Sequence, residues 1–195
     1  MSRGKFMVLY GLNSLGKSTQ ANILVEKIKS LGRPVQYVKY PIYDLEPTGP
    51  RLNEILRSGK IQTMDEYKLQ GIYAQNRMNF EPKLKKMLDS GITMVAEDYI
   101  GTGLAWGLTK GADLAKLEKQ NKGLLAEDIA LLLYGKPFSS GKEKNHLHES
   151  NDELMRRCGK NYQLLAKQYG WHTVNGNQTI EAVADDIWQV VKSQL

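Results

Sequence analysis

Residues 11–18, GLNSLGKS, constrain this chain more than any other segment, because they match the pattern G-x-x-x-x-G-K-[ST] at every fixed position. Residues 5–10 (KFMVLY) before this run are predicted to form a short buried strand, and residues 18–31 after it an amphipathic helix. A strand, a glycine-containing loop and a helix in that order are typical of a phosphate-binding loop. The alternative, a chance match in an ordinary turn, does not explain this context.

The predicted loop carries the groups that a nucleoside triphosphate needs. Glycines at both ends let backbone N–H groups turn toward one anion, and the following helix adds the positive end of its dipole. Lys17 would reach the β- and γ-phosphates, and the Ser18 hydroxyl would hold Mg²⁺. We therefore predict that a triphosphate binds to Gly11, Asn13, Ser14, Leu15, Gly16, Lys17, Ser18 and Thr19.

Length and composition favour one domain over residues 1–195, with a hydrophobic share of 41% that is enough for a core. No segment approaches the apolar length of a membrane span, and residues 1–5 lead into the first strand without a signal sequence. The single cysteine, Cys158, favours a reducing, cytoplasmic setting. The net charge of +6 permits nucleic acid or phosphorylated small molecules as partners. Because the basic residues are mixed with acids, we interpret most of them as solvated helix faces and a few as phosphate ligands. We predict no nucleic-acid and no membrane partner.

Predicted strands and helices alternate along the whole chain. Further strands are expected at 34–40, 92–97, 128–134 and 171–174, and helices at 48–58, 64–90, from 101 onward, at 151–169 and at 179–195. This order predicts an α/β fold with a five-stranded parallel sheet and helices on both faces. Ligands of such sheets bind at the carboxyl ends of the strands, where Gly11, Pro41 and Glu97 fall.

Two polar segments at this edge are candidates for catalysis. Glu97 and Asp98 end a buried strand, so at least one of them is expected to bind a metal or the substrate. The alternative is an acidic strand end without a role. Residues 136–150 are rich in glycine and serine, and we predict a mobile lid whose Lys142 and Lys144 add positive charge to the reacting phosphates. The alternative here is a surface loop.

Tyr73 and Arg77 lie four residues apart on the predicted helix 64–90 and therefore share a face. An aromatic ring can stack on a nucleobase, and a guanidinium one turn further can hydrogen-bond a base or a phosphate. A tyrosine at such spacing is more often part of the core, so this pair is weak evidence by itself.

Several segments together resemble the thymidylate kinase family of P-loop nucleoside-monophosphate kinases. Besides the loop, they are KYPIYD (39–44), YAQNR (73–77), EDYIGTGLAW (97–106), residues 146–170 (HLHESNDELMRRCGKNYQLLAKQYG) and residues 174–187 (VNGNQTIEAVADDI). The resemblance covers nearly the whole chain. It implies a P-loop kinase fold with a lid, transfer of the γ-phosphoryl group of ATP to dTMP with Mg²⁺, and a homodimer.

The resemblance also implies roles for individual residues. Tyr73 would stack on the base, Arg77 would hydrogen-bond it, and Tyr99 would pack against the sugar. Glu97 would stand for the family's aspartate and share Mg²⁺ with Ser18. The acceptor site would comprise Pro41, Tyr73, Arg77, Asp98 and Tyr99; Asn177 and Gln178 would lie near adenine; and Lys17, Glu97, Lys142 and Lys144 would be catalytic.

The chain departs from the family pattern at the acceptor phosphate. Asp98 stands where the family has the arginine of its Asp-Arg-Tyr segment, and Ile42 and Tyr43 follow Pro41 where another arginine is common. Each missing arginine removes a two-pronged grip on phosphate. Lys39, Arg51 or another basic residue would then take over. Otherwise the chain is a deoxynucleoside kinase acting on a neutral 5′-hydroxyl, or a catalytically weak nucleotide-binding relative.

Overall fold

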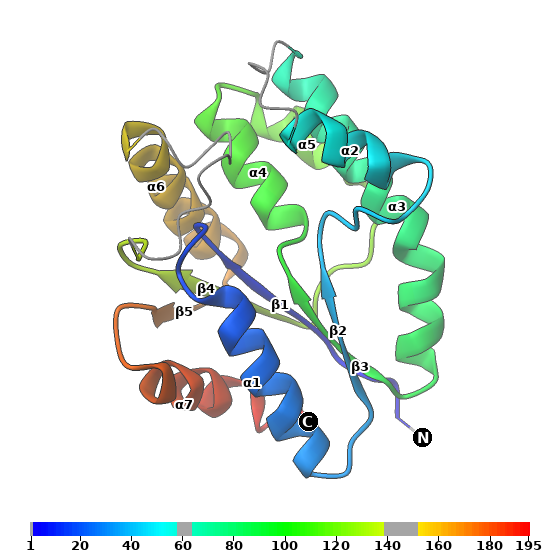
Figure 1. Cartoon of the computed structure of the whole chain (residues 1–195), viewed down its shortest axis with the longest axis vertical. Helices are drawn as coiled ribbons and strands as arrows, with labels where there is room; N and C mark the ends of the chain where they lie inside the picture. The colour runs from blue at the N-terminus through cyan, green and yellow to red at the C-terminus, as the bar shows by residue number, and fades with distance from the viewer. Residues whose placement is uncertain (1, 58–63, 139–151) are drawn as a thin grey trace.

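The structure is a computed structural model that describes residues 2–57, 64–138 and 152–195. Its centre is a five-stranded sheet of order β2-β3-β1-β4-β5, in which every neighbouring pair is parallel (Figure 1). The strands are β1 (Phe6–Gly11), β2 (Val35–Lys39), β3 (Thr93–Glu97), β4 (Ile129–Tyr134) and β5 (His172–Asn175). The helices are α1 (Lys17–Ser30), α2 (Thr48–Arg57), α3 (Glu66–Asp89), α4 (Ile100–Thr109), α5 (Leu114–Gln120), α6 (Asp152–Tyr169) and α7 (Ile180–Val191).

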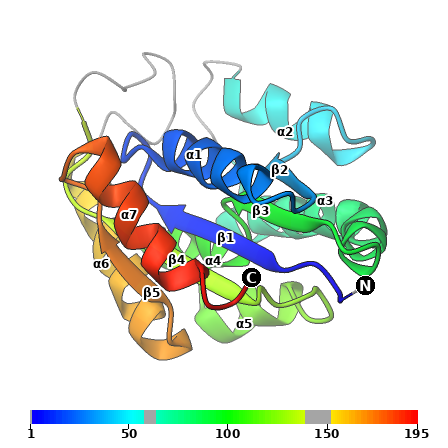
Figure 2. The ribbon, with the colours of Figure 1, turned by 90° about the horizontal axis from the view of Figure 1, so that it is seen from below.

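Helices cover both faces of the sheet, as Figure 2 shows. Helices α1 and α7 pack on one face, and their apolar residues join one core cluster with β1 residues such as Met7 and Leu9. Helices α3, α4 and α6 cover the other face around Phe6, Val8 and Tyr10. All six residues of β1 are buried because the strand has neighbours on both sides and helices on both faces. The predicted parallel α/β fold is confirmed.

The helix expected after Gly101 is α4, and a further helix, α5, was not predicted. The two are separated by a turn at Gly111, whose φ is 86°. The Asp113 side chain begins α5 by accepting a hydrogen bond from the Lys116 backbone N–H at 3.0 Å. The sequence contains both boundary signals: Lys110 and Gly111 at the end of one helix, and Asp113 as the N-cap of the next.

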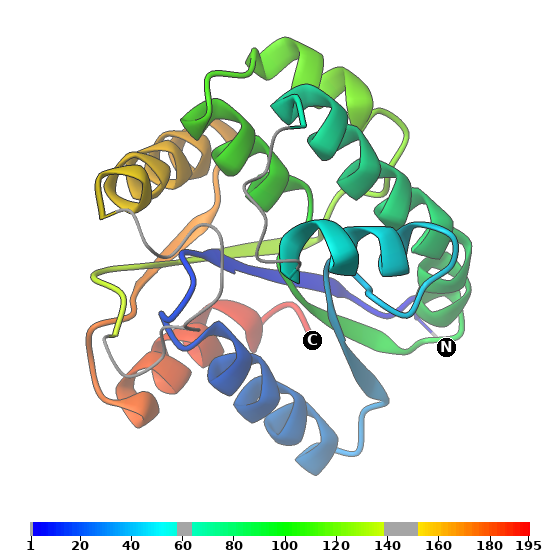
Figure 3. The same cartoon turned by 45° about the horizontal axis from the view of Figure 1, so that its top comes forward.

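The sheet register brings the candidate residues together at one edge. Glu97, the last residue of β3, pairs with Leu9 of β1 on one side and with Lys39, the last residue of β2, on the other. Figure 3 shows the loop before α1, the start of α4 and helix α2 arranged around this carboxyl edge. Most of the predicted lid, with Lys142 and Lys144, lies outside the described residues.

None of the described helices combines the length and the apolar character that a membrane crossing requires.

Candidate active site

The loop between β1 and α1 curls through three residues with positive φ. Gly11 has a φ of 141°, Ser14 of 59° and Gly16 of 82°. Such turns point successive backbone N–H groups into one hollow, which is the geometry of an anion site. Side chains cannot be added freely here, because a Cβ on Gly11 would lie 2.5 Å from the carbonyl oxygen of Leu133.

Lys17 is buried and folds back over this loop. Its Nζ donates hydrogen bonds to the carbonyl oxygens of Gly11 at 2.9 Å and Leu12 at 3.0 Å. The same atom lies 3.8 Å from Oδ1 of Asp98. The ammonium therefore sits between the phosphate loop and the acidic end of β3, where it would neutralise a phosphate bound in the loop.

A cavity of about 510 Å³ adjoins the loop on the side of α6. Among the described residues, its lining includes Asn13 and Ser14 of the loop and the cationic side chains of Lys136, Arg156 and Lys160, with Asp152 as the one acid. The excess of positive charge in this lining fits a polyphosphate.

The predicted loop ligands differ in exposure. Leu15 is buried in the core, so only its backbone can serve a phosphate, whereas Ser18 and Thr19 are exposed.

Glu97 is 3% exposed and receives hydrogen bonds from three side chains. Its Oε2 accepts from the Ser18 hydroxyl at 2.6 Å and from the Tyr37 hydroxyl at 2.8 Å, and Oε1 lies 2.9 Å from Nζ of Lys39. Burial acts to raise the pKa of Glu97, but Lys17, Ser18 and Lys39 together lower it below the usual value. The carboxylate is therefore ionised at neutral pH.

Ser18 and Glu97 fit a magnesium ion. A hydroxyl and a charged carboxylate are hard oxygen ligands, and Mg²⁺ needs few of them because it retains several waters. The hydroxyl hydrogen of Ser18 points to Glu97, which leaves the Ser18 oxygen lone pairs for a cation. Among the described residues no group of three or more acidic, histidine or cysteine side chains forms a metal site, so this site would be completed by water and phosphate.

Asp98 has an unusual backbone for a residue with a side chain, with a φ of 61°. Its Oδ1 accepts a hydrogen bond from the Thr102 hydroxyl at 2.8 Å, and the Tyr162 hydroxyl donates to Thr102 at 3.1 Å. Burial raises the pKa of Asp98, and Glu97 raises it further, although Lys17 opposes both effects. The Asp98 side chain is therefore held by two linked hydroxyl groups, that of Thr102 on α4 and that of Tyr162 on α6.

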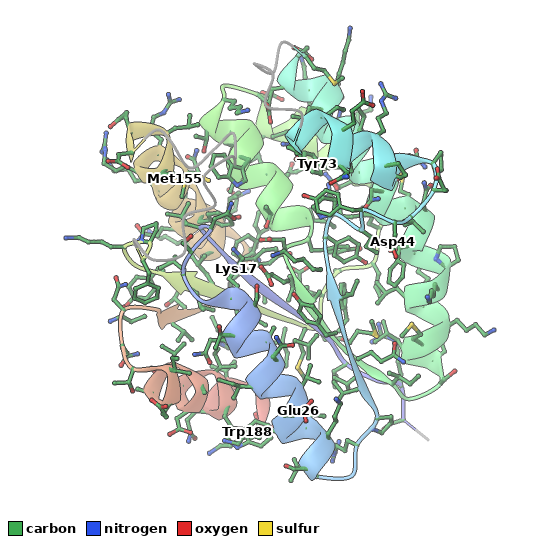
Figure 4. All side chains as sticks on the ribbon, viewed as in Figure 1. Lys17, Glu26, Asp44, Tyr73, Met155 and Trp188 are labelled. Atoms are coloured by element: carbon green, nitrogen blue, oxygen red, sulfur yellow. The ribbon has the colours of Figure 1, made fainter. Side chains whose placement is uncertain are left out.

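Helix α3 carries the predicted base-binding pair. Tyr73 is partly exposed, and Figure 4 shows it at the same end of the sheet as Lys17. Arg77 is 3% exposed; its Nε and one Nη donate to Oδ1 of Asn121, and the other Nη donates to the carbonyl oxygen of Tyr99. Burial lowers the pKa of Arg77. Asn121 thus fixes the plane of the Arg77 guanidinium, one helical turn after Tyr73.

Tyr99 supports the site from the core instead of presenting a face to it. Its ring is 1% exposed, and its hydroxyl donates to Oε2 of Glu81 at 3.3 Å.

The turn that contains Pro41 is tied to α3 by Asn76. The Asn76 side chain accepts a hydrogen bond from the Ile42 backbone N–H at 2.8 Å and donates one to the Ile42 carbonyl at 3.0 Å. Asn76 therefore fixes the end of β2 relative to Tyr73.

The predicted adenine residues follow β5. The Asn177 side chain pairs with both backbone groups of Lys136, accepting at 2.6 Å and donating at 2.8 Å. Gln178 donates to the Asn175 carbonyl at 3.0 Å and to Asp186 at 2.8 Å. Both side chains form hydrogen bonds within the protein. A ligand would therefore contact the loop that they build more than their amide groups.

Sequence reasoning missed the residues that hold the site in place. Tyr37 lies two residues before Lys39 on the same face of β2, a period that could have suggested a joint role. Asn76 and Asn121 gave no such signal, because their partners lie 34 and 44 residues away in the chain.

Comparison with known proteins tests the predicted family. A family model described as thymidylate kinase matches residues 9–187, which include the loop, Glu97, the α3 pair and the segment after β5. The chain belongs to the thymidylate kinase family. Among curated relatives of this family member, the thymidylate kinase of Arabidopsis thaliana is 28% identical over 99% of this chain and 73% of its own length. The human thymidylate kinase is also 28% identical, over 95% of this chain and 88% of its own.

The fold of this family member agrees with the sequence match. A solved structure of thymidylate kinase from Candida albicans has a TM-score of 0.83 and covers 100% of this chain and 93% of the solved one, at 22% identity. The P-loop kinase fold is therefore confirmed. Membership of the family also indicates that the chain is a phosphotransferase.

Proposed function

We propose that this chain transfers the γ-phosphoryl group of ATP to dTMP, giving dTDP, with Mg²⁺. The observation that carries the proposal is the Glu97 carboxylate, which Ser18 contacts from the phosphate loop and Lys39 from the end of β2. A metal ligand between a triphosphate loop and a base-binding helix is the arrangement that phosphoryl transfer needs.

The donor half consists of the phosphate loop and the basic cavity beside it. Backbone N–H groups of the loop bind the phosphates of ATP, and Lys17 neutralises the β- and γ-phosphates. Ser18 and Glu97 hold Mg²⁺, which neutralises charge on the phosphates when it is bound. Lys142 and Lys144, which lie outside the described residues, are proposed to add positive charge from the lid.

The acceptor half lies between α3 and the end of β2. Tyr73 stacks on the base, and Arg77 hydrogen-bonds it through N–H groups not used by Asn121 and Tyr99. Pro41 lines the acceptor nucleotide, and Tyr99 supports its sugar side from the core. Asn177 and Gln178 belong to the donor half, near the adenine of ATP. Catalysis by the two halves together is mainly positioning and charge neutralisation. The acceptor residues bring the acceptor oxygen in line with the γ-phosphate, and the donor residues neutralise the phosphate charge.

A second candidate is transfer to thymidine itself. The observation that favours it is Asp98, an acid within 3.8 Å of Lys17 that would repel a monophosphate but not a neutral hydroxyl. In that reaction Glu97 or Asp98 would accept the proton of the 5′-hydroxyl. A catalytically weak, nucleotide-binding role would combine ATP binding with neither reaction.

Initial rates of ADP formation distinguish these functions. ATP and Mg²⁺ are held constant while dTMP, thymidine and the other nucleoside monophosphates are compared as acceptors. We expect dTMP to give the highest kcat/KM. A higher value with thymidine would replace the proposal by the second candidate, and ATP binding without turnover on any acceptor would replace it by the weak-relative role.

We also propose that the chain acts as a homodimer in the cytoplasm, without nucleic acid or membrane as partner. Family membership supports the dimer, and the single buried cysteine is consistent with a reducing compartment. Light scattering behind a sizing column should give about twice the mass of one chain, 22.0 kDa. A monomer at micromolar concentration would contradict the dimer.

A further inference from the structure

The acceptor phosphate faces a charge problem at the end of β3. A nucleoside monophosphate carries nearly two negative charges and must approach the γ-phosphate close to both Glu97 and Asp98. Each carboxylate repels it at this distance unless a cation intervenes. The reaction proposed above therefore requires a positive group on the acceptor side of Glu97.

Lys39 is placed where this group is needed. It is the last residue of β2 and pairs in register with Glu97. Its Nζ lies 2.9 Å from Oε1 of Glu97, whereas the Ser18 and Tyr37 hydroxyls both use Oε2. The ammonium is thus on the carboxylate oxygen that Ser18 of the phosphate loop does not contact, and the turn with Pro41 follows Lys39 directly.

The Lys39 side chain can take a second anion. The side chain as a whole is 52% exposed while Nζ contacts Glu97, so Lys39 lies at the surface of the site and not in the core. An ammonium has three N–H donors, and a contact with one carboxylate oxygen uses one of them. A phosphate oxygen can therefore bind without breaking the ion pair to Glu97.

The other cations near the acceptor in the described part of the chain have different positions. Lys17 is held by the loop carbonyls, and Arg77 by Asn121 and the Tyr99 carbonyl. Arg51 lines a separate cavity of about 360 Å³ with Lys68 and Gln75 of α3. Positions 68 and 75 lie on one face of a helix and position 77 on the opposite one, so Arg51 faces the back of the base-binding helix.

We propose that Lys39 binds the phosphate of the acceptor nucleotide and bridges it to Glu97. The inference rests on the proposed function and goes beyond it by assigning the residue that recognises a monophosphate in place of a nucleoside. Lys39 offers a point charge instead of a planar fork, so recognition depends on charge more than on a two-pronged geometry. It also offsets the repulsion from Asp98.

The test is a binding cycle with and without the phosphate. Calorimetric titrations of dTMP and thymidine are performed with the wild type, Lys39→Gln and Lys39→Arg, in EDTA so that metal binding at Glu97 has no influence. We expect the wild type to bind dTMP about 10- to 100-fold more tightly than thymidine, the contribution of one charge-assisted hydrogen bond. Lys39→Gln should lose most of this ratio, with thymidine affinity unchanged, and Lys39→Arg should restore part of it.

Two control variants separate the phosphate contact from other effects. Arg51→Gln removes a cation of the neighbouring cavity and should leave the ratio unchanged. Tyr37→Phe removes another hydrogen-bond donor to Glu97. If the ratio of dTMP to thymidine affinity is unchanged in Tyr37→Phe, loss of a hydrogen bond to Glu97 does not by itself explain the effect of Lys39→Gln. If Lys39→Gln keeps the wild-type ratio of dTMP to thymidine affinity, the Lys39 contact is overturned and the dTMP acceptor is not. Binding of neither ligand by the wild type would overturn the dTMP acceptor and the Lys39 contact together.

Discussion

Glu97→Gln is the substitution that most directly separates the metal ligand from the fold. The two side chains have the same shape, so packing at this 3% exposed position is preserved. Glutamine, however, has an N–H₂ group where the carboxylate has a second acceptor oxygen. Three donors, from Ser18, Tyr37 and Lys39, now face one acceptor, and at least one of them loses its partner.

The cost to stability follows from which donor is displaced. If the amide oxygen keeps Ser18 and Tyr37, the N–H₂ group faces Lys39, which is half-exposed and can turn to water. A charge-assisted hydrogen bond contributes about 1.5–3 kcal/mol, and solvent screening at Lys39 reduces this to about 1 kcal/mol. For a chain of this size the expected decrease in Tm is about 2–4 °C.

The effect on catalysis is expected to be much larger. Loss of the charged ligand should decrease kcat by about 100-fold or more and increase the Mg²⁺ concentration needed for half-maximal rate. The assay is ADP formation across a magnesium series, beside thermal unfolding. Glu81→Gln is the matched control, because Glu81 is also buried and contacts Leu125, Tyr99 and Lys85. A Glu97→Gln rate within about threefold of wild type at equal Mg²⁺ would refute the metal role.

Three further predictions concern the loop and its surroundings. Lys17→Ala should abolish transfer while circular dichroism and Tm remain close to wild type; wild-type turnover would contradict the mechanism. Asp98→Asn should raise the free energy of unfolding at pH 7, because burial raises the pKa of Asp98 and its ionised form opposes folding. This gain should shrink as pH falls through the raised folded-state pKa, and urea unfolding at two pH values measures it. Gly135→Ala should lower Tm by several degrees, because its φ is 147° and a Cβ would lie 2.5 Å from Oδ1 of Asn177. Gly32→Ala, at a φ of 72° in open space, should lower it less.

Local patterns in the sequence were sufficient to predict the fold. Alternating apolar strands and helices gave the parallel sheet, and the loop motif located the carboxyl edge because the motif requires a strand before it and a helix after it. Helix α5 was not predicted, although Gly111 and the Asp113 cap mark the end of α4 and the start of a second helix.

The candidate site was only partly predictable. Lys17, Ser18 and Glu97 followed from motif and strand position, and the structure brings them together. Their supports could not be predicted, because Tyr37, Asn76 and Asn121 act through contacts between distant segments that no local pattern records. The burial of Tyr99 and the internal hydrogen bonds of Asn177 also depend on tertiary packing. Their ligand contacts stay predictions.

Binding of a bisubstrate analogue tests the central claim most directly. In such a molecule adenosine and thymidine are joined through their 5′-oxygens by a polyphosphate chain, so that one ligand spans both halves of the site. With Mg²⁺ present, we predict that it binds at least about 100-fold more tightly than ATP or dTMP alone, because the second half binds intramolecularly. Both Lys17→Ala and Tyr73→Ala should weaken it. Affinity no higher than that of ATP would contradict a phosphate loop and a base-binding helix that share one site.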